Sequence, residues 1–181
     1  MNVNIKRGIP VKNKVVEKNK VRAIIKTDEE KFLIVNYDGI YLFPGGKVEE
    51  NENYISALSR ELFEELGVKY EEDEFVPLIN IHHEQSNYPE RDGTITDRII
   101  NTAYFIAPYK GIDLNEIQLT EPEKNGNFKI EFLTEDEINL IIIGKNCKNP
   151  RNKFFMEELA CAVKIYNSKC NKYNGPTKTL K

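Results

Sequence analysis

The chain lacks several features that mark specialised classes of protein. No apolar run among its 181 residues approaches membrane-spanning length. The first residues, MNVNIKRGIPVKNK, contain no apolar core of the kind that signal peptides carry. The three cysteines, Cys147, Cys161 and Cys170, are scattered and have neither metal-ligand nor redox spacing. We therefore expect a cytoplasmic protein with free thiols and no association with a membrane.

The chain also has little excess charge of either sign. It contains 26 Lys and Arg against 29 Asp and Glu, a net charge of −3, which argues against non-specific DNA binding. With 181 residues, of which 40% are apolar, it suits one domain with its own core. We expect residues 1–20 to form an N-terminal arm or edge strand, residues 21–170 the domain, and residues 171–181 a flexible tail.

What the chain does contain is one dense stretch from Gly45 to Val68, reading GGKVEENENYISALSRELFEELGV. We predict a helix from about Asn53 to Leu66, because this part has no Pro or Gly and its leucines recur every four residues. Gly67 follows the last periodic residue, where a left-handed cap favours a residue without a β-carbon. The stretch therefore predicts a helix with a defined end.

Three carboxylates fall on one side of this helix. Glu61, Glu64 and Glu65 are neighbours at about 100° per residue, and like charges at this spacing repel by a few tenths of a kcal/mol per pair. Arg60 can offset one of them, but a single cation does not neutralise the set. A hard divalent cation such as Mg²⁺ would, because it takes oxygen ligands and bridges carboxylates to substrate phosphates. The glycine pair before the helix would let a backbone carbonyl or amide approach closely.

This stretch resembles the Nudix box, G-x5-E-x7-R-E-U-x-E-E-x-G-U, where U is a bulky aliphatic residue. Its specified positions are filled by Gly46, Glu52, Arg60, Glu61, Leu62, Glu64, Glu65, Gly67 and Val68. The resemblance to this MutT-like family implies an α/β fold, an α/β/α sandwich with a mixed β-sheet between helices. It also implies a Mg²⁺-dependent (or Mn²⁺-dependent) pyrophosphohydrolase that cuts a phosphoanhydride in a nucleoside phosphate or a nucleoside-diphosphate-linked metabolite.

The resemblance also implies roles for individual residues. Glu61, Glu64 and Glu65 would bind the metal, with the carbonyl of Gly45 as a further ligand. Arg60 would orient a box carboxylate, and together with the three glutamates it makes up the expected catalytic set. Glu61 is the first candidate for the general base. Two later loop residues, Glu121 and Glu123, remain open as alternatives.

Substrate choice should depend on residues outside the box, and no known subgroup of the family is identified. Arg91 and Arg98 are candidates to grip substrate phosphates, and Tyr88 or Phe43 to stack on a base. The expected partner is a small nucleotide-type molecule, and the chain would act as a monomer or a homodimer. The alternative function is a non-catalytic Nudix-like module that binds or senses a nucleotide.

Hydrophobic patterning predicts the other elements, and order and composition alone give a single α/β or α+β domain. The expected strands are residues 21–25 and 31–35 as a hairpin, then 40–43, 75–82, 101–108 and 128–133. A short helix from Ile138 and a long one over 152–168 would follow. We expect irregular polar segments at 84–97 and 111–126, and His82 and His83 on opposite sides of their strand.

Overall fold

The computed structural model describes residues 1–7, 13–37, 39–90, 92–125, 127–144 and 150–170. No helix in these ranges is long and apolar enough to cross a membrane. The elements, in chain order, are β1 (Asn2–Arg7), β2 (Val15–Lys26), β3 (Phe32–Tyr37), β4 (Ile40–Leu42), α1 (Tyr54–Leu66), a 3-10 turn (Glu72–Glu74), β5 (Val76–Pro89), β6 (Ile95–Pro108), α2 (Glu121–Asn125), β7 (Lys129–Leu133), α3 (Glu135–Gly144) and α4 (Pro150–Cys170).

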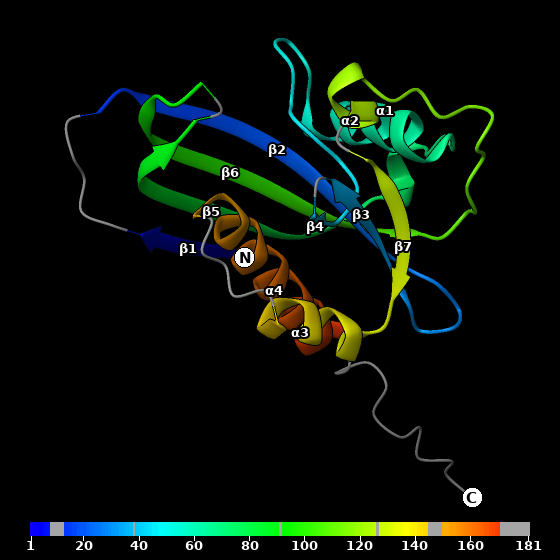
Figure 1. Ribbon diagram of the computed structural model, residues 1–181. Helices are drawn as coiled ribbons and strands as arrows, with labels where there is room; N and C mark the ends of the chain where they lie inside the picture. Colours follow the sequence, from blue (N-terminus) through cyan, green and yellow to red (C-terminus); the bar gives the residue numbers. More distant parts are fainter. Residues whose placement is uncertain (8–12, 38, 91, 126, 145–149, 171–181) are drawn as a thin grey trace, which may run out of the picture.

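The strands form one mixed seven-stranded sheet with two parts (Figure 1). In the longer part, β1 and β5 are parallel, β5 and β6 antiparallel, and β6 and β2 parallel. In the shorter part, β3 pairs antiparallel with both β4 and β7. The β2–β3 hairpin joins the two parts through the pair between Lys26 and Phe32.

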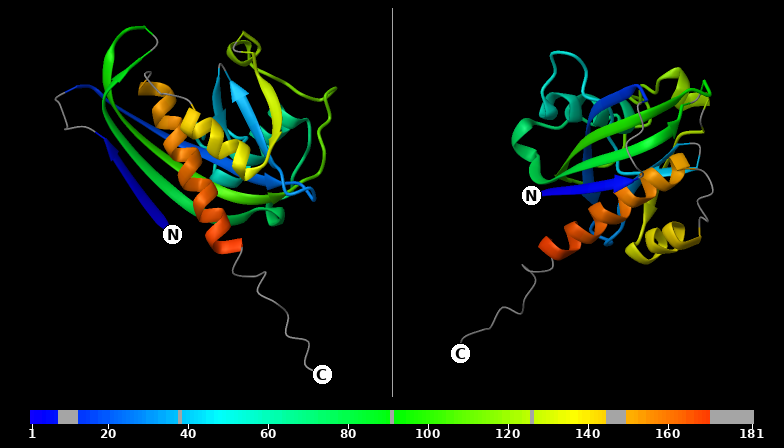
Figure 2. Two further views of the ribbon diagram at one scale, coloured as in Figure 1. Left: turned by 60° about the horizontal axis from the view of Figure 1, so that its bottom comes forward. Right: turned by 90° about the vertical axis from the view of Figure 1, so that its left-hand side faces the viewer.

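Helices cover both faces of the sheet (Figure 2). The leucines of α1 pack with Val21, Ala23 and Ile25 in one core, whereas Ile24 packs with residues of α4 such as Leu159 in a second core. Because successive side chains of a strand point to opposite faces, β2 contributes to both cores. The predicted α/β/α sandwich with a mixed sheet is therefore confirmed.

The helix predicted in the box is confirmed at both ends. α1 begins after Asn53, whose side chain accepts a hydrogen bond from the Ser56 backbone N–H at 2.9 Å. It ends at Gly67, which has a φ of 70° and donates its N–H to the carbonyl of Phe63. Each end is specified by residues within one turn of it, which explains why local sequence was enough.

The expectation of an irregular segment over 84–97 is wrong. β5 continues to Pro89 and β6 begins at Ile95, so most of this segment is a long hairpin. Its polar residues alternate, and one face is buried: Gln85, Tyr88 and Thr96 are buried, and Tyr88 packs edge-on against Phe154, with ring centroids 6.2 Å apart. The segment expected to be irregular over 111–126 also contains a helix, α2.

The N-terminal residues are part of the sheet. β1 pairs with β5 from Asn2 to Arg7, and β2 pairs with β6 from Val15 onward. The division into an arm, a domain and a tail stays a prediction, and the proposed tail, residues 171–181, lies outside the described residues.

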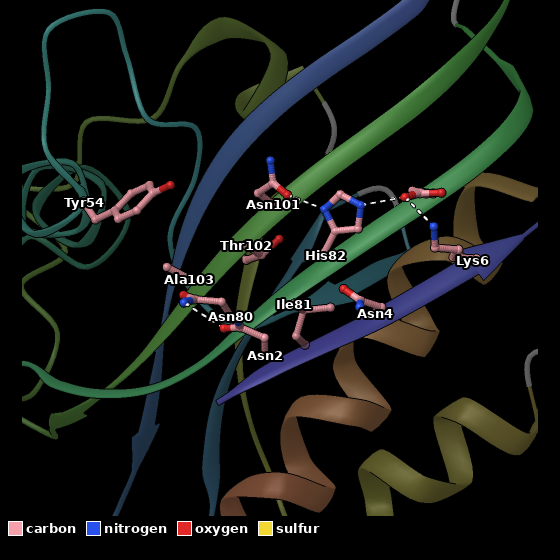
Figure 3. A pocket seen from close by; sticks show the side chains of 11 residues that line it. Asn2, Asn4, Lys6, Tyr54, Asn80, Ile81, His82, Asn101, Thr102 and Ala103 are labelled. Atoms are coloured by element: carbon pink, nitrogen blue, oxygen red, sulfur yellow. Dashed lines mark hydrogen bonds and ion pairs between the residues drawn. The ribbon is translucent and has the colours of Figure 1, made fainter.

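Polar contacts cross the exposed face of the four strands in the longer part of the sheet (Figure 3). Lys6 on β1 pairs with Glu84 on β5 at 3.0 Å. The same Glu84 oxygen lies 2.8 Å from Nε2 of His82, and Nδ1 of His82 lies 2.6 Å from Oδ1 of Asn101 on β6. The Asn101 amide nitrogen donates onward to Glu17 on β2 at 3.1 Å. These contacts link β1, β5, β6 and β2 beside a cavity of about 480 Å³.

This network predicts a pH-dependent contribution of His82 to stability. Both ring nitrogens face oxygen atoms, and the hydrogen bonds to Glu84 and Asn101 raise the pKa of His82. A folded-state pKa above the unfolded value of about 6.5 adds stability that is complete below that value and is lost as pH rises through the folded pKa. We expect His82→Gln to lower the free energy of unfolding more at about pH 5.5 than at about pH 8.5, measured by urea denaturation.

Asn80→Ala is the matched control, because Asn80 lines the same cavity but carries no titrating group. Its effect should be the same at both pH values. An equal loss at both pH values in His82→Gln would contradict the prediction.

Candidate active site

The site is built on a backbone segment that follows β4. This segment, residues 44–48, runs beside β2 as an extended chain: the N–H of Val21 donates to the carbonyl of Gly46 at 3.0 Å, and that of Ala23 to the carbonyl of Pro44 at 2.9 Å. The glycine pair is thereby held between β2 and α1.

Both glycines are required by close approach. Gly45 has a φ of +124°, and a β-carbon there would lie 2.4 Å from the carbonyl oxygen of Val21. A β-carbon at Gly46 would lie 2.3 Å from the carboxylate of Glu61. Any larger residue would displace the strand at the first position or the carboxylate at the second.

Glu65 and Glu61 lie against these glycines. Glu65 is only 5% exposed, and its Oε2 accepts a hydrogen bond from the backbone N–H of Gly45 at 2.7 Å. Burial raises the pKa of Glu65 well above its ordinary value, while the Gly45 hydrogen bond and the Arg22 charge oppose the rise. Burial also raises the pKa of Glu61, against the opposing charge of Arg60. Nearby positive charge would therefore favour the ionised form of both carboxylates.

Arg60 contacts three acidic residues of the box. It makes a two-pronged contact with Glu52, Nε to Oε1 and Nη2 to Oε2, both at 3.0 Å. Its Nη1 reaches Glu61 at 3.0 Å and Glu64 at 3.3 Å, and its Nη2 donates to the carbonyl of Lys47 at 3.0 Å. The pKa of Glu52 is lowered by this contact. Arg60 thus connects the loop before α1 to two of the three helix carboxylates.

A cavity of about 300 Å³ opens beside Gly45 and Glu65. Its lining also includes Arg22, Val35, Tyr37, Leu42, Thr120, Glu123 and Phe128. The structure therefore separates the two loop acids left open as bases. Glu123 lines this cavity, whereas Glu121 has a 78% exposed side chain and pairs with Lys124 at 3.1 Å.

Arg22 is a residue of this cavity that sequence reasoning missed. It belongs to no motif, and it interrupts the apolar run VRAII in β2. A charged residue inside a buried strand is rare unless it is paired. The presence of a charged residue within an apolar run was therefore the sequence signal that could have identified Arg22.

Among the described residues, the other substrate-binding candidates do not line this cavity. Arg98 contacts Glu90 at 2.9 Å, stacks over Tyr88 and lines a separate cavity. Arg91 lies outside the described residues. The idea that Phe43 or Tyr88 stacks on a base is wrong for this conformation, because both are at most 1% exposed. Both aromatic rings are packed inside the protein.

Three helix carboxylates do not by themselves form a metal cage. Among the described residues, no three His, Cys, Asp or Glu side chains are gathered so that they could hold an ion. Arg60 draws Glu61 and Glu64 to one side, while Glu65 turns to the N–H of Gly45. Mg²⁺ is nevertheless usually held by one or two carboxylates together with substrate phosphates. The oxygen-rich donor set of α1 fits that mode of binding.

Comparison with known proteins gives a family match over most of the chain. The family model described as the NUDIX domain matches residues 17–153. The 8-oxo-dGTP diphosphatase of Buchnera aphidicola subsp. Schizaphis graminum is 44% identical over 55 residues, which are 30% of this chain and 38% of that protein. The aligned part thus spans well under two thirds of that relative.

Solved structures share the fold. The MutT protein from Methanosarcina mazei Go1 superposes with a TM-score of 0.50 at 17% identity, over 86% of this chain and 99% of that one. A bifunctional NMN adenylyltransferase/ADP ribose pyrophosphatase from Francisella tularensis, complexed with AMP and a Mn ion, gives a TM-score of 0.52 at 18% identity, over 86% of this chain and 42% of that one. At these identities the likeness concerns the fold alone.

The two glycines predict different consequences of adding one methyl group. Gly45→Ala should destabilise the fold by about 1–3 kcal/mol, because its backbone is strained for a side chain and the new β-carbon meets the backbone of β2. Gly46→Ala should destabilise it less, because it meets the movable end of the Glu61 side chain. Chemical denaturation of both variants checks this order.

Gly144→Ala serves as the control, since a β-carbon there has nothing within 4 Å. The reverse order, or a neutral Gly45→Ala, would refute the close approach of this segment to β2.

Proposed function

This chain belongs to the NUDIX family of hydrolases, and from that premise we propose that it is a Mg²⁺-dependent (or Mn²⁺-dependent) pyrophosphohydrolase. Its substrate would be a nucleoside phosphate or a nucleoside-diphosphate-linked metabolite, cut at a phosphoanhydride bond. The observation that carries this proposal is the placement of Glu61 and Glu65 against Gly46 and Gly45, with Glu65 and Gly45 lining the same cavity. One acid of the motif, Glu65, therefore borders a space that could take a ligand.

The residues of the motif would have different roles in catalysis. Glu61, Glu64 and Glu65 would hold the ion, helped by the carbonyl of Gly45. When bound, a divalent ion supplies charge neutralisation for the phosphates and makes the attacking water more acidic. Arg60 holds Glu61 and Glu64 in place and, through Glu52, ties the helix to the loop before it.

The proton acceptor would be Glu61 or Glu123. Glu61 lies beside the glycine pair with only 12% of its side chain exposed, where a bound water would be close to a carboxylate shielded from bulk solvent. Glu123 reaches the cavity from α2. We propose Glu61 as the first candidate for the base and Glu123, which lines the cavity, as the second.

The curated relative suggests the first substrate class to test. That protein is named for action on an oxidised purine nucleoside triphosphate. We propose nucleoside triphosphates, canonical-base and oxidised, as the leading class, with ADP-ribose and other nucleotide-linked metabolites next. Whether the protein works as a monomer or a homodimer remains a prediction.

Neutralising a helix acid should remove activity without unfolding the protein. We expect Glu64→Gln and Glu65→Gln each to lower kcat by at least about 100-fold, because each removes a negative charge that must meet the ion. The nucleotide products would be measured by chromatography with Mg²⁺ and with Mn²⁺ across the substrate panel, and circular dichroism would check the fold.

Glu72→Gln is the control, an exposed acid in the 3-10 turn that should leave turnover unchanged. Unchanged turnover in both helix variants would overturn the metal assignment. Tight nucleotide binding by the folded protein with no product at any metal concentration would instead favour a sensing module.

Glu121 and Glu123 offer a matched pair of substitutions two positions apart. If Glu123 accepts the proton, Glu123→Gln should lower kcat by about 100-fold and alter the acidic limb of the pH–rate profile, whereas Glu121→Gln should do neither. Full activity in Glu123→Gln would leave Glu61 as the base.

A further inference from the structure

The buried half of β2 contains one cation that no part of the motif explains. Arg22 is 3% exposed, and its partner Glu158, on α4, is 1% exposed. The Nε atom of Arg22 lies 3.6 Å from Oε1 of Glu158, and the same oxygen accepts a hydrogen bond from the hydroxyl of Tyr104 at 2.8 Å. A charged pair is therefore enclosed between the sheet and the helix on the face opposite α1.

The other end of the guanidinium reaches the active-site segment. Nη1 of Arg22 donates to the carbonyl of Phe43 at 2.6 Å and to the carbonyl of Gly45 at 3.2 Å. These two carbonyls belong to the backbone that leaves β4 and enters the glycine pair. Arg22 therefore fixes this turn of the chain at two points.

Gly45 is consequently held from both sides of the sheet. Its N–H donates to Glu65 of α1, and its carbonyl accepts from Arg22, which α4 anchors through Glu158. The contact with Arg22 is long, and a carbonyl oxygen has two lone pairs, so one remains for a ligand in the cavity.

This pair is not optimised for stability. Nε of Arg22 and Oε2 of Glu158 are buried atoms for which the described residues provide no hydrogen-bond partner. Buried ion pairs with incomplete hydrogen bonding contribute little net stability, and well-packed apolar replacements are often as stable. The geometry instead serves the position of the backbone that Arg22 contacts.

We propose that Arg22, anchored by Glu158, is a positioning residue that holds the Gly45–Gly46 segment against Glu65 and Glu61. The inference rests on the proposed function in one respect, that these carboxylates are the ones that bind the ion. Through this pair, α4 controls the geometry of a site on the opposite face of the sheet.

The test removes both charges together, so that neither is left buried alone. Arg22→Met/Glu158→Gln should keep its circular dichroism spectrum and lose little thermal stability. Its affinity for Mn²⁺, measured by electron paramagnetic resonance, should fall at least 10-fold, and kcat should fall at least 10-fold with KM changed less than 3-fold. The Gly45 amide signal in ¹H–¹⁵N spectra should shift and exchange faster with solvent.

Two milder variants keep the test decisive if the double variant does not fold. Arg22→Lys retains the charge, but its single ammonium cannot span both carbonyls and Glu158, so the effects should be intermediate. Tyr104→Phe removes one hydrogen bond to Glu158 and should shift the Gly45 amide in the same direction, by less. The control, Lys110→Met/Glu74→Gln, removes an ion pair of 2.9 Å elsewhere and should change none of these measurements.

Each result decides the proposal. A folded double variant with unchanged Mn²⁺ affinity, Gly45 amide and kcat overturns it, as do unchanged values in both Arg22→Lys and Tyr104→Phe. If the wild-type protein hydrolyses nothing on the panel, but the Gly45 amide shifts and Mn²⁺ affinity falls in the variants, the positioning role stands and the proposed function fails.

Discussion

The site depends on the close approach of one backbone segment to β2. Residues 44–48 lie near enough to form hydrogen bonds with Val21 and Ala23, and only glycine fits where the segment passes the strand and the helix acids. This contact decides where the N–H of Gly45 points, and therefore where Glu65 lies. The order of the motif, a glycine pair followed by an acidic helix, follows from that geometry.

The same contact explains how the protein accommodates three acids on one helix face. Their repulsion would weaken an isolated helix, and burial alone would favour their neutral forms. The fold opposes both effects: Arg60 donates to Glu61 and Glu64, the N–H of Gly45 donates to Glu65, and the charge of Arg22 lowers the pKa of Glu65 and Glu61. In the proposed function, a divalent ion bridging to phosphate would supply further positive charge to these acids.

Local patterns predicted the ends of α1 better than the extent of the long strands. The α1 boundaries followed from Asn53, the leucine spacing and Gly67, all within the helix or one residue of it. The β5–β6 hairpin was missed between 84 and 97 because its polar side chains looked like those of a loop. Pairing of its two ends with β1 and β2, together with packing of Tyr88 on Phe154, holds that segment in the sheet. Those contacts involve residues distant in the sequence, which no short window contains.

The sequence by itself determined the motif, the helix that carries it and its Gly67 cap, because each depends on residue types at fixed short spacing. The resemblance of that motif to a known family then implied the class of fold. Only the tertiary structure decided which other residues meet the motif. It placed Glu123 at the cavity and Glu121 in solvent, buried Phe43 and Tyr88, and joined Arg22 to Glu158 across the sheet. The physical reason is that side-chain partners are chosen by the packing of layers, and layers bring together residues whose separation along the chain carries no signal.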